Sequence, residues 1–211
     1  MIHIQSKLPR DVYVACSGGV DSMGVVDFLR RNHNCTLLFF DHGTETSKEA
    51  REFLADYIHQ KNREFWKTPP ATVLKLEIGE ISRSKEKDES WEEYWRKERY
   101  KWFHSLDKTV ITCHHLDDCV ETWIFNSLHG EGRIIPYRNL NVIRPFRENR
   151  KAEFVNWCRK NNVSWVEDTS NEDTSFMRNF IRKELIDKCL VVNPGLHKVI
   201  RKKVLEENVF V

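Results

Sequence analysis

The segment Val14–Ser22 is the sequence feature that most constrains this fold. An apolar run ends there at Ser17-Gly18-Gly19, and a helical stretch starts at Val20 without a spacer. Two consecutive glycines let the backbone turn tightly and aim its N–H groups at one point, and the helix dipole favours an anion there. We therefore expect a strand, an anion-binding loop and a helix in succession. A plain Gly-Gly turn without a ligand is the alternative.

This loop differs from the two commonest nucleotide-binding motifs. No Gly-Lys-Ser/Thr follows the glycines, and the spacing is not that of a dinucleotide fingerprint. The loop resembles that of the N-type ATP pyrophosphatases, which split ATP between its α- and β-phosphates. The resemblance implies that ATP lies on this loop and that the loop holds the departing pyrophosphate. The implied ATP-binding residues are Ser17, Gly18, Gly19, Val20, Asp21 and Ser22.

Strands and helices alternate along the chain, which predicts an α/β fold with a doubly wound parallel sheet. The expected strands are residues 11–16, 35–40, 65–68 and 109–113, with a short one within 71–89 and a mobile loop at 82–89. The expected helices are residues 20–32, 46–60, 91–106, 117–128, 151–161, 176–187 and 196–207, the second with a capping box of Thr46 and Glu49. Residues 133–141 are expected to form a loop.

Charge is unevenly distributed along the chain. Residues 1–132 carry 18 Lys and Arg against 22 Asp and Glu, whereas residues 133–211 carry 16 against 10. The basic second part favours a polyanionic partner such as nucleic acid, although a solvated, charge-patterned surface is equally compatible. We expect a PP-loop ATP pyrophosphatase domain over 1–145 and a short helical extension with a basic surface over 146–211.

Composition narrows the class of protein further. No apolar run approaches the roughly 18 residues of a membrane span, and the N-terminus lacks the apolar core of a signal peptide. The six cysteines include no Cys-x-x-Cys pair, so reduced, buried thiols are expected. We expect a cytoplasmic protein with no membrane partner, and the oligomeric state stays open.

A second chemical motif lies at residues 113–122, where an expected strand meets an expected helix. Asp117, Asp118 and Glu121 gather three carboxylates at that junction. Such a cluster calls for a cation, either Mg²⁺ or a substrate ammonium. A zinc site formed by His114, His115 and the flanking cysteines is one rival reading. A helix capped by Asp117 with a solvated acidic face is the other.

With this motif the chain resembles the tRNA(Ile)-lysidine synthetases in particular. Residues 114–122 follow their His-His-x-Asp-Asp-x-x-Glu-Thr pattern. Further matches are Glu92, Arg96, Arg99 and Tyr100; residues 128–132, with His129 where arginine is usual; Arg144-Pro145-Phe146; residues 165–171; and Arg178, Asn179 and Arg182. Thr44-Glu45 departs from the usual Leu-Arg. The chain also has the length expected of a short form without C-terminal tRNA-binding domains.

The resemblance implies a two-step reaction that uses ATP, Mg²⁺, free L-lysine and an isoleucine tRNA with a CAU anticodon. The wobble cytidine is adenylated, and the lysine ε-amine then displaces AMP to give lysidine. The implied catalytic residues are Asp21, His114, Asp118, Glu121 and Arg96. The implied ligands of the Mg²⁺ ion are Asp21 and Asp117. The implied contacts to substrate or tRNA are Asp117, Arg99, Arg144, Asn171, Arg178, Asn179 and Arg182.

Several alternatives stay open on the sequence. A tRNA thiolase of the same superfamily, a silent RNA-binding relative and a small-molecule amidating synthetase share the loop. Arg96 and Arg99 are also explained by surface ion pairs on their helix, and Arg178 and Arg182 by a solvated helix face. We expect Trp91, Trp95 and Trp102 to belong to the core rather than to a base-stacking platform.

Overall fold

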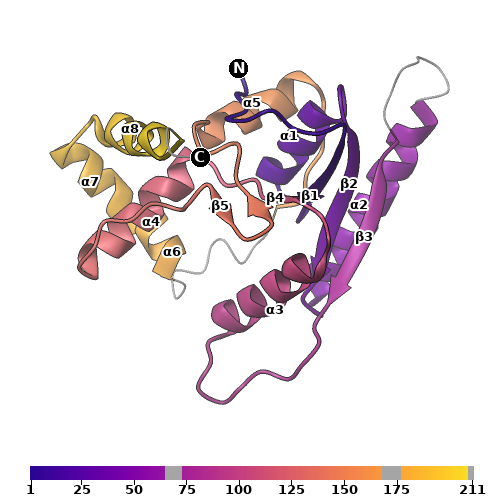
Figure 1. The fold of residues 1–211 in the computed structure, drawn as a ribbon, viewed down its shortest axis with the longest axis horizontal. Coiled ribbons are helices and arrows are strands. Elements are labelled where there is room, and N and C mark those ends of the chain that lie inside the picture. The colour runs from indigo at the N-terminus through magenta and orange to yellow at the C-terminus, as the bar shows by residue number, and fades with distance from the viewer. Residues whose placement is uncertain (65–72, 168–176, 209–211) are drawn as a thin grey trace.

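A six-stranded sheet forms the centre of the molecule (Figure 1). The structure is a computed structural model that describes residues 1–64, 73–167 and 177–208. The strands are β1 (Asp11–Ala15), β2 (Asn34–Asp41), β3 (Lys75–Glu80), β4 (Val110–Ile111), β5 (Arg138–Asn139) and β6 (Val142–Ile143), in the order β3-β2-β1-β4-β6-β5. All neighbours pair in parallel except β5 and β6. The predicted α/β fold with a parallel sheet is confirmed.

Helices cover both faces of this sheet. They are α1 (Val20–Leu29), α2 (Glu45–Glu64), α3 (Trp91–Ser105), α4 (Leu116–Leu128), α5 (Lys151–Lys160), α6 (Met177–Phe180), α7 (Ile186–Val192) and α8 (Leu196–Asn208), with a π-helical turn, Ile181–Leu185, between α6 and α7. Alternate strand residues face opposite ways, so Val12 and Val14 pack with α1, α2 and α5, whereas Tyr13 packs with α3. A third cluster joins α4, the π-turn and α8.

Strand order reverses beside β1, which lies between β2 and β4. Ligands of doubly wound sheets bind outside the carboxyl ends of the strands at such a point. The chain leaves β1 at Ala15 into the glycine loop and leaves β4 at Ile111 into the carboxylate motif. The topology therefore brings the two sequence motifs to one edge of the sheet.

Most expected elements are present, with several corrections. The capping box of Thr46 and Glu49 is wrong: α2 starts at Glu45, and the Thr44 hydroxyl accepts the Ser47 N–H. The loop expected before Asn141 contains the short strand β5, which pairs with β6. The helix expected over 176–187 continues to Val192 through the π-turn, and the strand expected over 65–68 lies outside the described residues.

Helix α5 shares the core of the α/β sheet. Its Phe154 and Cys158 are fully buried in the cluster that contains α1, and Gly24 of α1 lies against both side chains. The division between residues 145 and 146 stays a prediction. The loop after β3 is held by Arg83, whose guanidinium contacts Glu89 at 2.9 Å and Glu98 at 3.1 Å. No helix in the three described ranges has the length and apolarity to cross a bilayer.

The contact between Gly79 in β3 and Trp102 in α3 leaves no room for a larger residue. A Cβ at position 79 would lie 2.2 Å from an indole carbon of Trp102. We expect Gly79→Ala to destabilise the protein by about 1–3 kcal/mol through overpacking, measured as a lower midpoint of thermal unfolding. Adding Trp102→Leu to the same chain should restore part of the loss. Equal stability of Gly79→Ala and the parent would contradict this packing.

Candidate active site

The glycine loop has the backbone that an anion site requires. Gly18 has φ +85°, a left-handed conformation that a side chain would strain, and Gly19 caps α1 without a side-chain hydrogen bond. The first N–H groups of α1 are therefore left for a ligand. The Ser22 hydroxyl donates to Gly19 O at 2.9 Å and holds the turn, whereas Ser17 is exposed beside it.

A later part of the chain closes over this loop. The Val166 N–H donates to Gly18 O at 2.9 Å. Val166 belongs to the stretch that the sequence marked as a motif from Trp165 onward, and that stretch therefore lies against the loop. Asn171, a predicted tRNA contact in the same motif, lies outside the described residues.

Asp21 joins the loop to the carboxylate motif. Its Oδ2 lies 3.6 Å from His115 Nε2 and 3.8 Å from the Nζ of Lys151, the first residue of α5. Its Oδ1 is buried and has no hydrogen-bond partner among the described residues. A buried carboxylate oxygen without a partner is a suitable ligand for a cation.

His115 is buried at the centre of the acidic cluster, where it caps α4. Its backbone N–H donates to Asp118 Oδ2 at 2.9 Å, and its ring lies within 3.6 Å of Asp117, Asp118 and Asp21. Burial alone would lower the pKa of His115, but Asp118 and Asp21 outweigh it and raise the pKa to about 9. A protonated ring carries a hydrogen on both nitrogens, so its Nδ1 faces the Asp118 and Asp117 carboxylates at 3.4 and 3.6 Å, and the cap of α4 consists of the bond from the His115 backbone N–H to Asp118.

The cap of α4 is therefore formed by His115, and the cap that the sequence offered to Asp117 is not used. Asp117 instead binds the start of α5: its Oδ2 accepts the Lys151 N–H at 2.7 Å, and its Oδ1 accepts the Arg150 Nε at 3.0 Å. His197 of α8 adds a third contact at 3.3 Å. Asp117 thus fixes α5, and with it Lys151, beside the glycine loop.

Asp118 and Glu121 differ in how much of each carboxylate is left for a substrate. Burial would raise the pKa of Asp118, but His115 and other nearby positive groups lower it overall, so it is charged. Its Oδ1 lies 3.9 Å from Arg182 Nη2, beyond hydrogen-bond distance. Glu121 is 2% exposed and accepts two bonds from Arg182, at 2.7 and 2.8 Å. Asp118 is the more available of the two.

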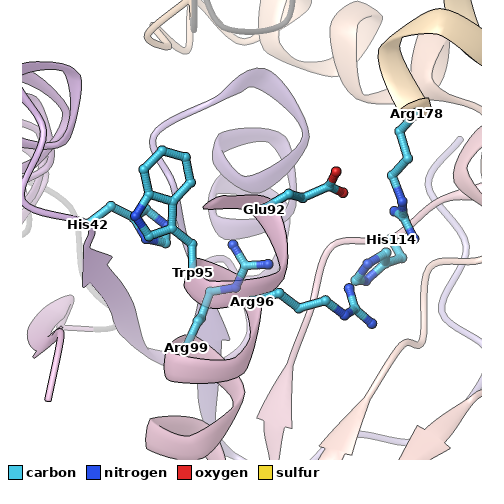
Figure 2. A pocket seen from close by; sticks show the side chains of 7 residues that line it. All are labelled: His42, Glu92, Trp95, Arg96, Arg99, His114 and Arg178. Carbon is cyan, nitrogen blue, oxygen red and sulfur yellow. The ribbon is translucent and has the colours of Figure 1, made fainter. Parts of the chain in front are cut away.

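The π-turn places Arg182 for this bond. Arg182 lies 61 positions after Glu121 in the chain and is the second residue of the π-turn. Arg178 lies four residues earlier, on α6, and points into the neighbouring cavity (Figure 2). In the motif Arg178-Asn179-x-x-Arg182, the first arginine thus lines the cavity and the second binds Glu121. Asn179 between them is buried.

A cavity of about 170 Å³ lies beside the acidic cluster (Figure 2). It is lined by His42, Glu92, Trp95, Arg96, Arg99, His114 and Arg178. The lining brings together residues from α3, α6 and the ends of β2 and β4. Three arginines with only one carboxylate among them make the cavity a site for an anion.

The charges in the cavity act on one another. Burial lowers the pKa of Arg99, and the neighbouring Arg96 and Arg178 lower it further. Burial, together with Arg144, Arg178 and Arg96, lowers the pKa of His114 to about 3, against the opposing effect of Asp118. His114 is thus a neutral imidazole with a hydrogen bond of 2.9 Å to Thr112, and it is a weak base. An anion bound here would relieve the repulsion among the arginines.

Arg144 lies behind the cavity and is 2% exposed. Its guanidinium donates to Pro136 O at 2.9 Å and to the Tyr100 hydroxyl at 3.0 Å, so it fixes the side chain of Tyr100, a residue of α3. Arg96 then lies 4.8 Å from the centre of the Tyr100 ring. A direct tRNA contact for Arg144 stays a prediction, and its observed contacts are internal.

The structure also brings residues to the site that the motifs did not mark. Lys151, Trp95 and His42 fall outside the predicted site residues, and His115 was considered only as a zinc ligand. The position of Lys151 depends on α5 docking through Asp117, a contact between segments more than thirty residues apart. The described ranges contain no group of three or more Cys, His, Asp or Glu side chains with the arrangement of a metal site.

This chain matches two relatives along most of its length. It is 30% identical over 208 residues to the tRNA(Ile)-lysidine synthase of Thermotoga maritima and 32% identical over 214 residues to that of Thermosipho africanus, matches that cover 92% and 94% of this chain. The chain spans about half the length of these relatives, 48% of each.

A solved structure shares the fold. The U34-tRNA thiolase NcsA from Methanococcus maripaludis, solved with its 4Fe-4S cluster, superposes with a TM-score of 0.65 over 97% of this chain and 74% of the thiolase, at 12% identity. A family model described as the PP-loop domain matches residues 2–189, nearly the whole chain. The chain therefore belongs to the PP-loop domain family.

Proposed function

We propose that this chain catalyses the lysidine synthetase reaction on an isoleucine tRNA with a CAU anticodon. Membership of the PP-loop family implies that it uses ATP. The observation that supports the rest is that Asp118 shares the ring of His115 with Asp21 of the ATP loop, while His114, four residues before Asp118, lines a cavity with three arginines. A zwitterionic amino acid with a charged side chain needs both kinds of site.

In the first step the cytosine O2 attacks the α-phosphorus of ATP, and pyrophosphate leaves from the loop. The N–H groups at the start of α1 hold the departing phosphates. Lys151, whose Nζ lies 3.8 Å from Asp21 Oδ2, offers them a positive charge. Mg²⁺ supplies charge neutralisation of the phosphates when it is bound. Asp21 fits that ion because its Oδ1 is buried without a partner, whereas both oxygens of Asp117 are engaged in holding α5.

In the second step the ε-amine of lysine attacks C2 of the cytosine, and the C2–O bond to AMP breaks. The carboxylate of lysine lies among Arg96, Arg99 and Arg178, and its ammonium lies toward Asp118 Oδ1. An unperturbed lysine has a pKa of about 10.4, so a proton must leave before attack. Asp118 binds the ammonium, orients it and accepts its proton, while Glu121 acts through Arg182.

The thiolase reading stays as the second candidate function because a solved thiolase shares the fold. We favour lysine as the nucleophile because the relatives that match most of this chain are lysidine synthases, whereas the thiolase shares 12% of its residues.

The test is transfer of label from lysine to RNA. The protein is incubated with ATP, Mg²⁺, radiolabelled lysine and isoleucine tRNA with a CAU anticodon. We expect one lysine on the tRNA for each AMP released, and no transfer to a tRNA whose wobble base is uridine. AMP formation without lysine on the tRNA, in a preparation that is active toward another acceptor, would overturn the proposal.

A further inference from the structure

An aromatic ladder leads from the cavity to the surface. Its inner rung is His42, whose ring centre lies 5.4 Å from that of Trp95. Trp91, one helical turn earlier in α3, lies 5.4 Å from Trp95 with the ring planes 38° apart. Figure 2 shows the His42 and Trp95 rings side by side at the cavity wall. The ladder thus continues outward from the site by one large ring.

Trp91 is 54% exposed, which corrects the expectation that all three tryptophans of α3 belong to the core. Its covered side packs against Trp95 and, edge to face, against Tyr94 at 5.9 Å. About half of the Trp91 surface is therefore covered by neighbouring side chains, and the other half is open to solvent. A single exposed apolar side chain is normal on a protein surface, but Trp91 is also held in place at the end of a row of rings that starts in the cavity, a position that suits contact with a planar group.

Basic and acidic side chains both lie near this ring, and the exposed Glu92 follows it directly in α3. Lys85 Nζ lies 5.4 Å from the centre of the Trp91 ring. The nearby acids Glu89 and Glu93 are held in ion pairs with Lys97, at 3.1 and 2.8 Å. Arg96 and Arg99 line the cavity on the same helix. Exposed aromatic rings beside basic side chains bind unpaired bases by stacking and their phosphates by charge.

We propose that Trp91 stacks on an unpaired base of the RNA substrate next to the base that is modified. The inference rests on the proposed function for the identity of that substrate. The strand would run from the glycine loop, where the modified base meets ATP, past the cavity that holds lysine and along the ladder to the surface. The adenine of ATP is the other planar group available, but it is tied to the phosphate loop, whereas Trp91 is the ring of the ladder farthest out.

The test uses the full chain and an RNA hairpin with the anticodon loop of the substrate. Trp91→Ala should weaken hairpin binding, measured without ATP, by about tenfold or more, since one stacked base contributes that much. Trp91→Phe should retain most of the affinity, and Val73→Ala, which removes an exposed apolar side chain before β3, should change nothing. The KM for ATP should be unchanged in Trp91→Ala.

Abasic hairpins identify the stacked base. With an abasic site on one side of the modified cytidine, Trp91→Ala should cause no further loss, whereas an abasic site on the other side should leave the full effect. Equal affinity of Trp91→Ala and the parent for the intact hairpin would overturn the inference, as would a raised KM for ATP with RNA binding unchanged. Parent protein that binds RNA through Trp91 but transfers no lysine would instead refute the proposed function alone.

Discussion

Arg182→Met should lower the free energy of unfolding by about 3–5 kcal/mol, because it leaves the buried carboxylate of Glu121 without its cation. Glu121 is 2% exposed, and both of its oxygens accept bonds from the Arg182 guanidinium. The loss should be seen as a lower midpoint in urea at neutral pH. No other side chain in the described ranges forms a hydrogen bond or ion pair with this carboxylate.

A double variant separates the ion pair from general damage to the fold. Glu121→Met with Arg182→Met removes both charges, and we expect most of the stability to return while activity stays lost. The loss in the single variant should also depend on pH. Burial raises the pKa of Glu121 above its ordinary value, against the opposing effect of Arg182, so without Arg182 this carboxyl takes up a proton more readily in the folded state than in the unfolded state. The penalty should therefore be largest well above the raised pKa and shrink as pH falls toward 4. A double variant no more stable than Arg182→Met would contradict this account.

Asp118→Asn should reduce lysine transfer by at least about a hundredfold, the range in which a residue that handles a proton or its charge contributes. Asparagine keeps the shape and can still accept the His115 N–H, so the cap of α4 is preserved. What the variant loses is the negative charge on the oxygen that faces Arg182 and the proposed ammonium. The measurement is label from lysine on tRNA at saturating ATP.

Asp187→Asn is the matched control for this variant, since it removes an exposed carboxylate of α7 and should leave transfer unchanged. Thermal unfolding of both variants shows whether either has lost structure. A fall in transfer that follows a fall in stability would assign Asp118 to the fold rather than to the reaction.

The sequence allowed the central sheet and the two main motifs to be predicted. Alternating apolar strands and amphipathic helices constrain a chain to a parallel sheet, and ligands of such sheets gather at the carboxyl ends of the strands. Residues 17–22 and 114–121 could therefore be expected at one edge of the sheet from the sequence alone. Local patterns were sufficient because each motif lies where one strand meets one helix.

The pairing of the carboxylates could not be predicted in the same way. Asp117 and Glu121 lie one turn apart in α4, yet one binds the start of α5 and the other the π-turn. These partners depend on how helices dock after the sheet has formed, which spacing along the chain does not encode. The π-turn itself widens the helix by a local change that the apolar period of residues 176–187 does not reveal.

The exposure of Trp91 shows the limit of helical periodicity. Tyr94 and Phe103 supply the buried face of α3, together with Glu98, which is buried because Arg83 neutralises it. Trp91 begins the helix beside the loop of residues 82–89, where Lys85 rather than the sheet lies over its ring. A pattern of large apolar residues predicts a buried stripe only where another element is present to cover it.

We propose that the glycine loop activates the RNA with ATP while Asp118 serves the incoming amine. One experiment addresses both halves: the parent protein and Asp118→Asn are incubated with tRNA, ATP labelled at the α-phosphate and lysine carrying a second label. We expect Asp118→Asn to continue to transfer AMP to the tRNA, with pyrophosphate released, while lysine incorporation is lost. Equal loss of AMP transfer and lysine transfer would contradict the claim and would place Asp118 with ATP and its metal ion.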